Sequence, residues 1–127
     1  MLRLRRGDTD MARIFPLTAI FLFGFTAAHS QTAPAKVAPG SYACWANGQA
    51  RMLLNFTIKS ATQYTGSDGK PGSYSYASNG RLTFKGGSLD GAMPEGYTTI
   101  YHEPKGLPTV SFRSPRGAEA SFCQLKR

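Results

Sequence analysis

Turn-forming residues divide this chain, from Gly40 onward, into pieces that are too short for ordinary helices. Asn47-Gly48 and Asn79-Gly80 suit tight hairpin turns, because both positions of such a pair tolerate positive φ. Clusters of Gly, Pro, Ser and Asp predict further turns at 67–72, 104–106 and 114–117. No stretch of ten residues in this part of the sequence has a helical period, so we predict an all-β fold.

The pieces between the turns alternate apolar and polar residues, which is the pattern of strands with one buried face. In the piece 51–59, the residues expected on the buried face are Met52, Leu54, Phe56 and Ile58. The expected strands are 41–46, 51–59, 62–66, 73–77, 81–85, 97–103, 107–114 and 118–124. Seven or eight strands joined mainly by short turns predict a small antiparallel meander barrel, with a β-sandwich as the alternative.

Two cysteines, Cys44 and Cys123, lie in the first and the last of the expected strands. Their separation does not fit the close spacing of redox Cys-x-x-Cys pairs or of zinc ligands, so we predict a structural disulfide. In the chain-entropy model, closing a loop of this length stabilises a domain by about 4–5 kcal/mol. The bond would tie the two ends of the sheet together where a barrel closes.

The N-terminal stretch predicts export. Met11-Ala12-Arg13 provides a short basic start, 14–28 is an apolar run, and small residues follow up to Ser30. These are the three parts of a secretory signal peptide. The run is shorter than the roughly 20 apolar residues that a spanning helix needs, so we expect cleavage rather than a stable membrane anchor. The protein would then be periplasmic or secreted, where disulfides persist.

This interpretation divides the chain into three parts. Residues 1–30 would be an N-terminal extension and signal peptide, cleaved after Ala28 or Ser30, with Met11 as the expected start. Residues 31–39 contain two prolines and small residues, and we expect a flexible leader. Residues 40–127 would form the single β domain.

The predicted mature chain, 31–127, is basic, with 11 Lys and Arg against 5 Asp and Glu. A basic balance favours anionic partners, and export makes an anionic envelope component the candidate rather than nucleic acid. The cations that lie toward the C-terminal end, and that could form a weak anion-binding patch, are Lys105, Arg113, Arg116, Lys126 and Arg127.

Catalytic chemistry is scarce in this sequence. His102 is the single histidine of 31–127, and Glu103 beside it would point to the opposite face of the strand, so the two cannot form an acid–base pair. Asp90 and Glu95 share the long glycine-rich connection 86–96 but offer too few oxygens for calcium. We therefore expect no catalytic residue, no metal and no cofactor, and a binding protein rather than an enzyme.

Loops on a rigid sheet often carry binding residues, so we take the 67–73 loop and the 86–96 connection as the candidate binding surface. Tyrosine at a barrel mouth would suit a ring-shaped ligand, because its hydroxyl can orient the ligand. The candidate binding residues are Ser67, Asp68, Ser73, Tyr74, Lys85, Asp90, Glu95 and Tyr97.

Four short segments resemble one known family. They are Tyr42-Ala43-Cys44, Ser67 to Tyr74, Lys85-Gly86 and Cys123-Gln124-Leu125, and they resemble the bacterial periplasmic C-type lysozyme inhibitors. The resemblance implies a small exported β-barrel with a disulfide from an early strand to the last. It also implies that the residues in contact with a lysozyme cleft would be Ser67, Ser73, Tyr74 and Lys85. We expect an envelope or secreted binding module of unknown ligand, with an inhibitor of a cell-wall lytic enzyme such as lysozyme as the alternative.

Overall fold

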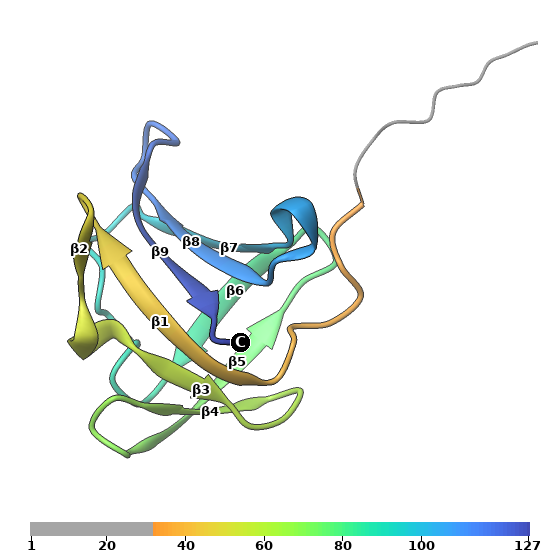
Figure 1. The fold of residues 1–127 in the computed structure, drawn as a ribbon, viewed down its shortest axis with the longest axis vertical. Coiled ribbons are helices and arrows are strands. Elements are labelled where there is room, and N and C mark those ends of the chain that lie inside the picture. The colour runs from red at the N-terminus through yellow and green to blue at the C-terminus, as the bar shows by residue number, and fades with distance from the viewer. Residues whose placement is uncertain (1–31) are drawn as a thin grey trace, which may run out of the picture. The chain divides into compact units, whose positions relative to one another are not determined.

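The computed structural model describes residues 32–127, which form a closed antiparallel β-barrel (Figure 1). The strands are β1 (Gly40–Ala46), β2 (Gln49–Ala50), β3 (Phe56–Ile58), β4 (Gln63–Gly66), β5 (Pro71–Tyr76), β6 (Arg81–Lys85), β7 (Thr98–His102), β8 (Thr109–Arg113) and β9 (Glu119–Leu125). Two 3₁₀ turns complete the elements, η3 (Met52–Leu54) and η4 (Pro104–Gly106). The predicted all-β fold is confirmed. The signal peptide, the start at Met11 and both cleavage positions lie outside the described residues.

Eight strands close the barrel in chain order, and β2 is an additional short strand. β2 pairs with the end of β1 across a turn in which Asn47 and Gly48 have φ of 53° and 75°. The Asn-Gly pair predicts this turn, because both residues tolerate a left-handed backbone. β9 returns to pair with β1 over four residues, so the sheet closes on itself as a meander does.

The predicted disulfide is confirmed at this closing seam. Cys44 and Cys123 are directly opposite each other in the pairing of β1 with β9, and their sulfur atoms are bonded. Both side chains are almost fully buried inside the barrel. A structural disulfide is typical of an oxidising location outside the cytoplasm.

Aromatic side chains fill the interior. Phe56 stacks on Tyr42 with ring centroids 4.9 Å apart, and it meets the edge of Phe84 at 5.8 Å. The other buried apolar residues of the core are Val37, Cys44, Ile58, Tyr64, Tyr74, Leu82, Leu89, Tyr101, Val110, Phe112 and Cys123. Those that lie on strands follow the alternation seen in the sequence, because successive residues of a strand face opposite sides of a sheet.

The strand expected over 51–59 is interrupted, which corrects the sequence-based prediction. Residues 52–54 form η3 instead, and Met52 and Leu53 are 71% and 85% exposed. The cause lies in Asn55, whose side-chain oxygen accepts the backbone N–H of Cys44 at 2.9 Å. That side chain takes the place of a backbone partner, so the pairing of β3 with β1 begins at Phe56.

Residues 33–39, here called the strap, lie against one end of the barrel. Val37 is 5% exposed and belongs to the core. The strap does not pair with a strand. Tyrosine hydroxyls form hydrogen bonds with its backbone groups instead. These bonds are Tyr42 to the Ala38 carbonyl (2.6 Å), Tyr76 to the Pro34 carbonyl (2.7 Å) and the Ala38 N–H to Tyr101 (3.1 Å). The compact unit therefore begins at Ala33, inside the segment predicted as a flexible leader.

The antiparallel order places the connections alternately at two ends of the barrel (Figure 1). We call one the strap end; it holds the strap, the connections 59–62, 77–80 and 103–108, and residues 126–127 after β9. We call the other the loop end; it holds the connections 47–55, 67–70, 86–97 and 114–118.

Candidate functional site

The pairing between β6 and β7 is the shortest between any two neighbouring strands of the barrel. Arg81 pairs with Ile100 and Leu82 with Thr99, whereas the other barrel seams have three to five paired positions. Beyond Leu82 the two strands separate toward the loop end, and β6 continues beside the connection 86–97 instead. This separation opens the barrel wall between β6 and β7.

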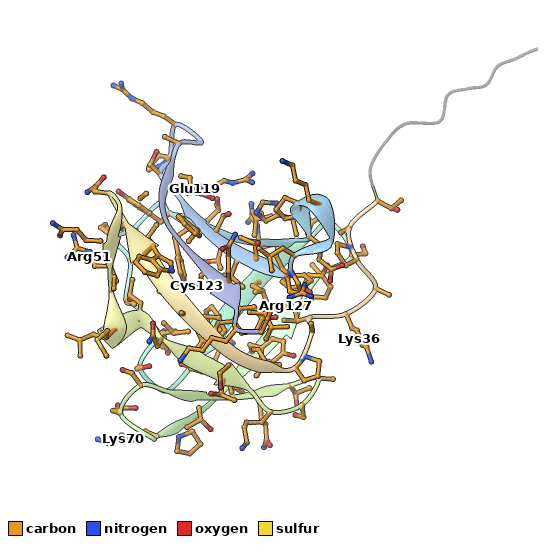
Figure 2. All side chains as sticks on the ribbon, in the orientation of Figure 1. Lys36, Arg51, Lys70, Glu119, Cys123 and Arg127 are labelled. Atoms are coloured by element: carbon orange, nitrogen blue, oxygen red, sulfur yellow. A yellow bond between two sulfur atoms is a disulfide. The ribbon has the colours of Figure 1, made fainter. Side chains whose placement is uncertain are left out.

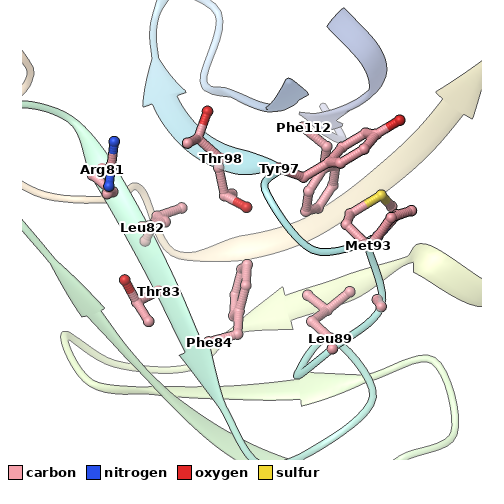
Figure 3. Close-up of a pocket in the computed structure, with 13 residues that line it drawn as sticks. Arg81, Leu82, Thr83, Phe84, Leu89, Met93, Tyr97, Thr98 and Phe112 are labelled. Carbon is pink, nitrogen blue, oxygen red and sulfur yellow. The ribbon is translucent and has the colours of Figure 1, made fainter. Parts of the chain in front are cut away.

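A pocket of about 240 Å³ lies at this opening (Figure 3). Its floor is apolar and comes from β6, β8 and the 86–97 connection: Leu82, Phe84, Leu89, Met93 and Phe112. Its polar side chains are Arg81, Thr83, Tyr97, Thr98 and Thr99. Arg81 is the single charged residue among the thirteen that line it, and no carboxylate is among them. The site can therefore hold an apolar group beside a positive charge and several hydroxyls.

The buried hydroxyl of Tyr64 on β4 fixes the start of the 86–97 connection. It donates to the Gly86 carbonyl at 2.5 Å and accepts the Leu89 N–H at 3.0 Å. Burial raises the pKa of Tyr64, so the phenol stays protonated and can donate its hydrogen bond to the Gly86 carbonyl. A Cβ atom at Gly87 would lie 2.6 Å from this hydroxyl, which leaves no space for a side chain there. Tyr64 thus positions Leu89 in the pocket floor.

The structure separates Tyr97 from three of the other candidate residues, Tyr74, Asp90 and Glu95. Tyr97 lines the pocket. Asp90 accepts the Gly86 N–H at 2.8 Å and closes a turn, and Glu95 is exposed and outside the lining. Tyr74 is a core residue, with its hydroxyl donating to the Ser60 carbonyl at 2.6 Å. Of these four residues, Tyr97 alone is among the thirteen that line the pocket.

The remaining candidates lie in the turn between β4 and β5, on β5 and on β6. Ser67 donates to the Leu53 carbonyl at 3.0 Å, and Asp68 accepts the Lys70 N–H within its own turn. Ser73 and Lys85 are paired directly across β5 and β6, both exposed, and the Ser73 hydroxyl donates to the Lys85 carbonyl at 3.2 Å. Ser73 and Lys85 are therefore neighbours on the outer face of β5 and β6.

Most of the pocket residues were not predicted from the sequence as site residues. Leu82, Phe84 and Phe112 occupy ordinary inward-facing strand positions, and Leu89 and Met93 are apolar residues in a glycine-rich connection. The length of the 86–96 connection, which led us to take it as a candidate binding surface, is the sequence signal that points to this site. A long connection allows the two strands that it joins to stay apart next to the connection and to pair only further along.

A second polar cluster joins β7, β8 and β9. The hydroxyl of buried Ser111 donates to Glu119 at 2.5 Å and lies 2.8 Å from Nε2 of His102. Because that hydroxyl gives its proton to Glu119, it accepts a hydrogen bond from His102. Ser111 lies between His102 and Glu119. In a nucleophilic triad, by contrast, the histidine lies between the serine and the acid. Burial, and then Arg113, lowers the pKa of His102, while Glu119 opposes them. These hydrogen bonds link side chains of three neighbouring strands.

Within residues 32–127 no three His, Cys, Asp or Glu side chains gather as metal ligands. In the same part of the chain, no helix has the length and apolar character to cross a membrane. No protein-family model, curated protein or solved structure matches the chain.

Proposed function

We propose that this chain is an exported, non-enzymatic binding module whose ligand occupies the pocket between β6 and β7. The observation that carries the proposal is the early end of the β6–β7 pairing, which leaves a pocket over the apolar core in an otherwise paired wall. Binding sites of small molecules are typically concave and mostly apolar, with a few polar groups that orient the ligand. A pocket of about 240 Å³ suits a small ligand, or one end of a longer one.

The lining indicates the ligand's chemistry. Met93 is partly exposed and, with the buried Phe84 and Phe112, gives the pocket an apolar lining for a ring or an alkyl chain. Arg81 would attract a carboxylate, sulfate or phosphate group, and the absence of carboxylates from the lining removes a source of repulsion. We therefore assign the site to an amphipathic ligand that is anionic rather than cationic.

Two features support export. The Cys44–Cys123 disulfide suits an oxidising compartment, and the N-terminal basic start with its apolar run has the form of a signal peptide. The proposal of a non-enzymatic protein is supported by the geometry of His102, Ser111 and Glu119, which is that of a structural cluster.

Titration with a fluorescent apolar carboxylate tests the proposed pocket, with the amine of the same skeleton as a comparison. Ala92 is exposed and lines the pocket, so Ala92→Trp should fill the opening and abolish carboxylate binding. Ala61→Trp makes the same change at an exposed position of the strap end and should leave binding unchanged. Equal binding of the acid and the amine, or equal binding by both variants, would contradict the assignment.

A second candidate is inhibition of a cell-wall lytic enzyme, which the adjacency of Ser73 and Lys85 favours. The two side chains could enter a cleft together from the outer face of β5 and β6. Near-stoichiometric protein should then slow lysozyme on cell walls, and Lys85→Ala should relieve the inhibition while Lys59→Ala should not. Undiminished lysis in a large excess of protein would eliminate this candidate.

A further inference from the structure

The charges of the described chain are distributed unequally between the two ends of the barrel. The segments of the strap end carry one carboxylate side chain, Glu103, and five cations: Lys36, Lys59, Lys105, Lys126 and Arg127. The connections of the loop end carry three carboxylates and three cations: Asp68, Asp90, Glu95, Arg51, Lys70 and Arg116. One end is thus strongly basic and the other is balanced.

Hydrogen bonds bring the segments that carry these cations together at the strap end, although they are far apart in the sequence. The Lys126 N–H donates to the Ser41 carbonyl at 2.8 Å, and the Ser41 hydroxyl contacts that of Thr57, two positions before Lys59. The Arg127 guanidinium donates to the Gly106 carbonyl at 3.3 Å, beside Lys105.

The strap adds the fifth cation. Lys36 directly precedes Val37, whose side chain is buried in the core, so the position of Lys36 in the chain is fixed against the barrel. Figure 2 labels Lys36 and Arg127, and all five cationic residues are exposed. The negative side chain of this end is Glu103, which accepts the Tyr101 hydroxyl.

We propose that the strap end is a docking surface for an anionic phospholipid bilayer. The position of the apolar run in the sequence favours a bilayer over other polyanions. The compact unit begins at Ala33 in the strap, and the apolar run 14–28 ends only a few residues earlier in the sequence. Until the predicted cleavage, only residues 29–32 separate this apolar run from the strap in the sequence, so an exported chain would carry its basic end a few residues from its membrane-directed segment. The negative charge of the lipid headgroups complements the five cations.

This contact would be electrostatic and would not need insertion into the hydrocarbon. The large hydrophobic side chains that are exposed in the described chain are Trp45, Met52 and Leu53. They lie on the end of β1 and on η3, toward the loop end, and so would face away from the bilayer. Binding through the strap end should therefore be reversible and should weaken as salt screens the cations.

Co-sedimentation with vesicles tests the proposal. Protein with its disulfide formed should bind vesicles of phosphatidylcholine mixed with phosphatidylglycerol at low salt, and should release them at high salt. It should not bind phosphatidylcholine alone. Each cation near an anionic surface is worth about fivefold in affinity, so the double variant Lys59→Gln/Lys126→Gln should bind about 20-fold more weakly. The matched double variant Arg51→Gln/Lys70→Gln removes the same charge from the loop end and should bind within about twofold of the unchanged protein.

Three results would overturn the proposal. Equal losses in the two double variants would mean that net charge acts without a defined surface. Salt-resistant binding that Met52→Ser/Leu53→Ser abolishes would mean that the loop end inserts instead. Retention on an acidic polysaccharide without binding to the anionic vesicles would assign the surface to a different polyanion. Ala92→Trp, which fills the pocket, should leave vesicle binding unchanged, so this test is independent of the ligand assigned to the pocket.

Discussion

Cys44 of β1 lies directly opposite Cys123 of β9, with their Cα atoms 3.9 Å apart, at the seam that closes the barrel. The disulfide spans 79 positions of the sequence, whereas most other barrel seams join strands linked by a single connection. Loop closure over so many residues carries the largest entropic cost among these contacts. The disulfide is placed where it offsets that cost.

Replacing both cysteines, Cys44→Ser with Cys123→Ser, should lower the free energy of unfolding by about 4–5 kcal/mol, because the unfolded chain regains the freedom of a long loop. Urea unfolding monitored by circular dichroism measures the change. A loss below about 1 kcal/mol would mean that the hydrogen bonds of the seam close the barrel without the covalent bond.

Tyr64→Phe should weaken the pocket as well as the fold. The change leaves the Gly86 carbonyl and the Leu89 N–H without their shared partner, at a cost of about 1–3 kcal/mol. Because Leu89 belongs to the pocket floor, affinity for the apolar carboxylate should fall too. Tyr74→Phe is the matched control, since its hydroxyl bonds Ser60 at the strap end. Equal loss of affinity in both variants would contradict the anchoring role of Tyr64.

The barrel could be predicted from the sequence because its signals are local. Alternation places residues such as Phe56 and Phe84 on an inner face, and Asn47-Gly48 predicts a turn from two adjacent residues. The start of β3 could not be predicted in this way. It depends on a hydrogen bond between the Asn55 side chain and Cys44, eleven positions apart, which no periodicity reveals.

The pocket and the strap depend on contacts between distant segments. Tyr97 was predicted as a binding residue, but Phe112 reaches the same pocket from β8 and has the pattern of any core position. Proline and small residues made the strap resemble a free leader. The strap is held by Val37, which packs in the core, and by tyrosine hydroxyls on three different strands. Amino-acid composition cannot predict such contacts between distant segments.

Mild acid should destabilise the fold through His102. Burial and Arg113 lower the pKa of His102 below its ordinary value of 6.5, so the unfolded chain binds the proton first. The stabilising contribution is complete above about pH 6.5 and is lost as the pH falls through the lowered pKa. His102→Gln should flatten this decline in unfolding experiments between about pH 7 and pH 5. An identical decline in the variant would show that another group causes it.

Alkali should unfold the barrel as its buried phenols ionise. Burial raises the pKa of Tyr42, Tyr64, Tyr74, Tyr76 and Tyr101, that of Tyr101 to about 12. Stability from these neutral phenols is complete below about pH 10, where the unfolded chain begins to ionise, and is lost as the pH rises further. Phenolate absorbance from the buried tyrosines should appear together with the loss of the β-sheet circular dichroism. Ionisation of all of them while the sheet signal persists would contradict their buried, hydrogen-bonded placement.

Amide chemical shifts, recorded while the protein is titrated with the apolar carboxylate, test the pocket most directly. The shifts should move at 81–84, at 89–99 and at Phe112, and should stay constant in the 67–70 turn and in the strap. Changes centred on the 67–70 turn or the strap end, or no saturable change anywhere, would contradict a ligand site between β6 and β7.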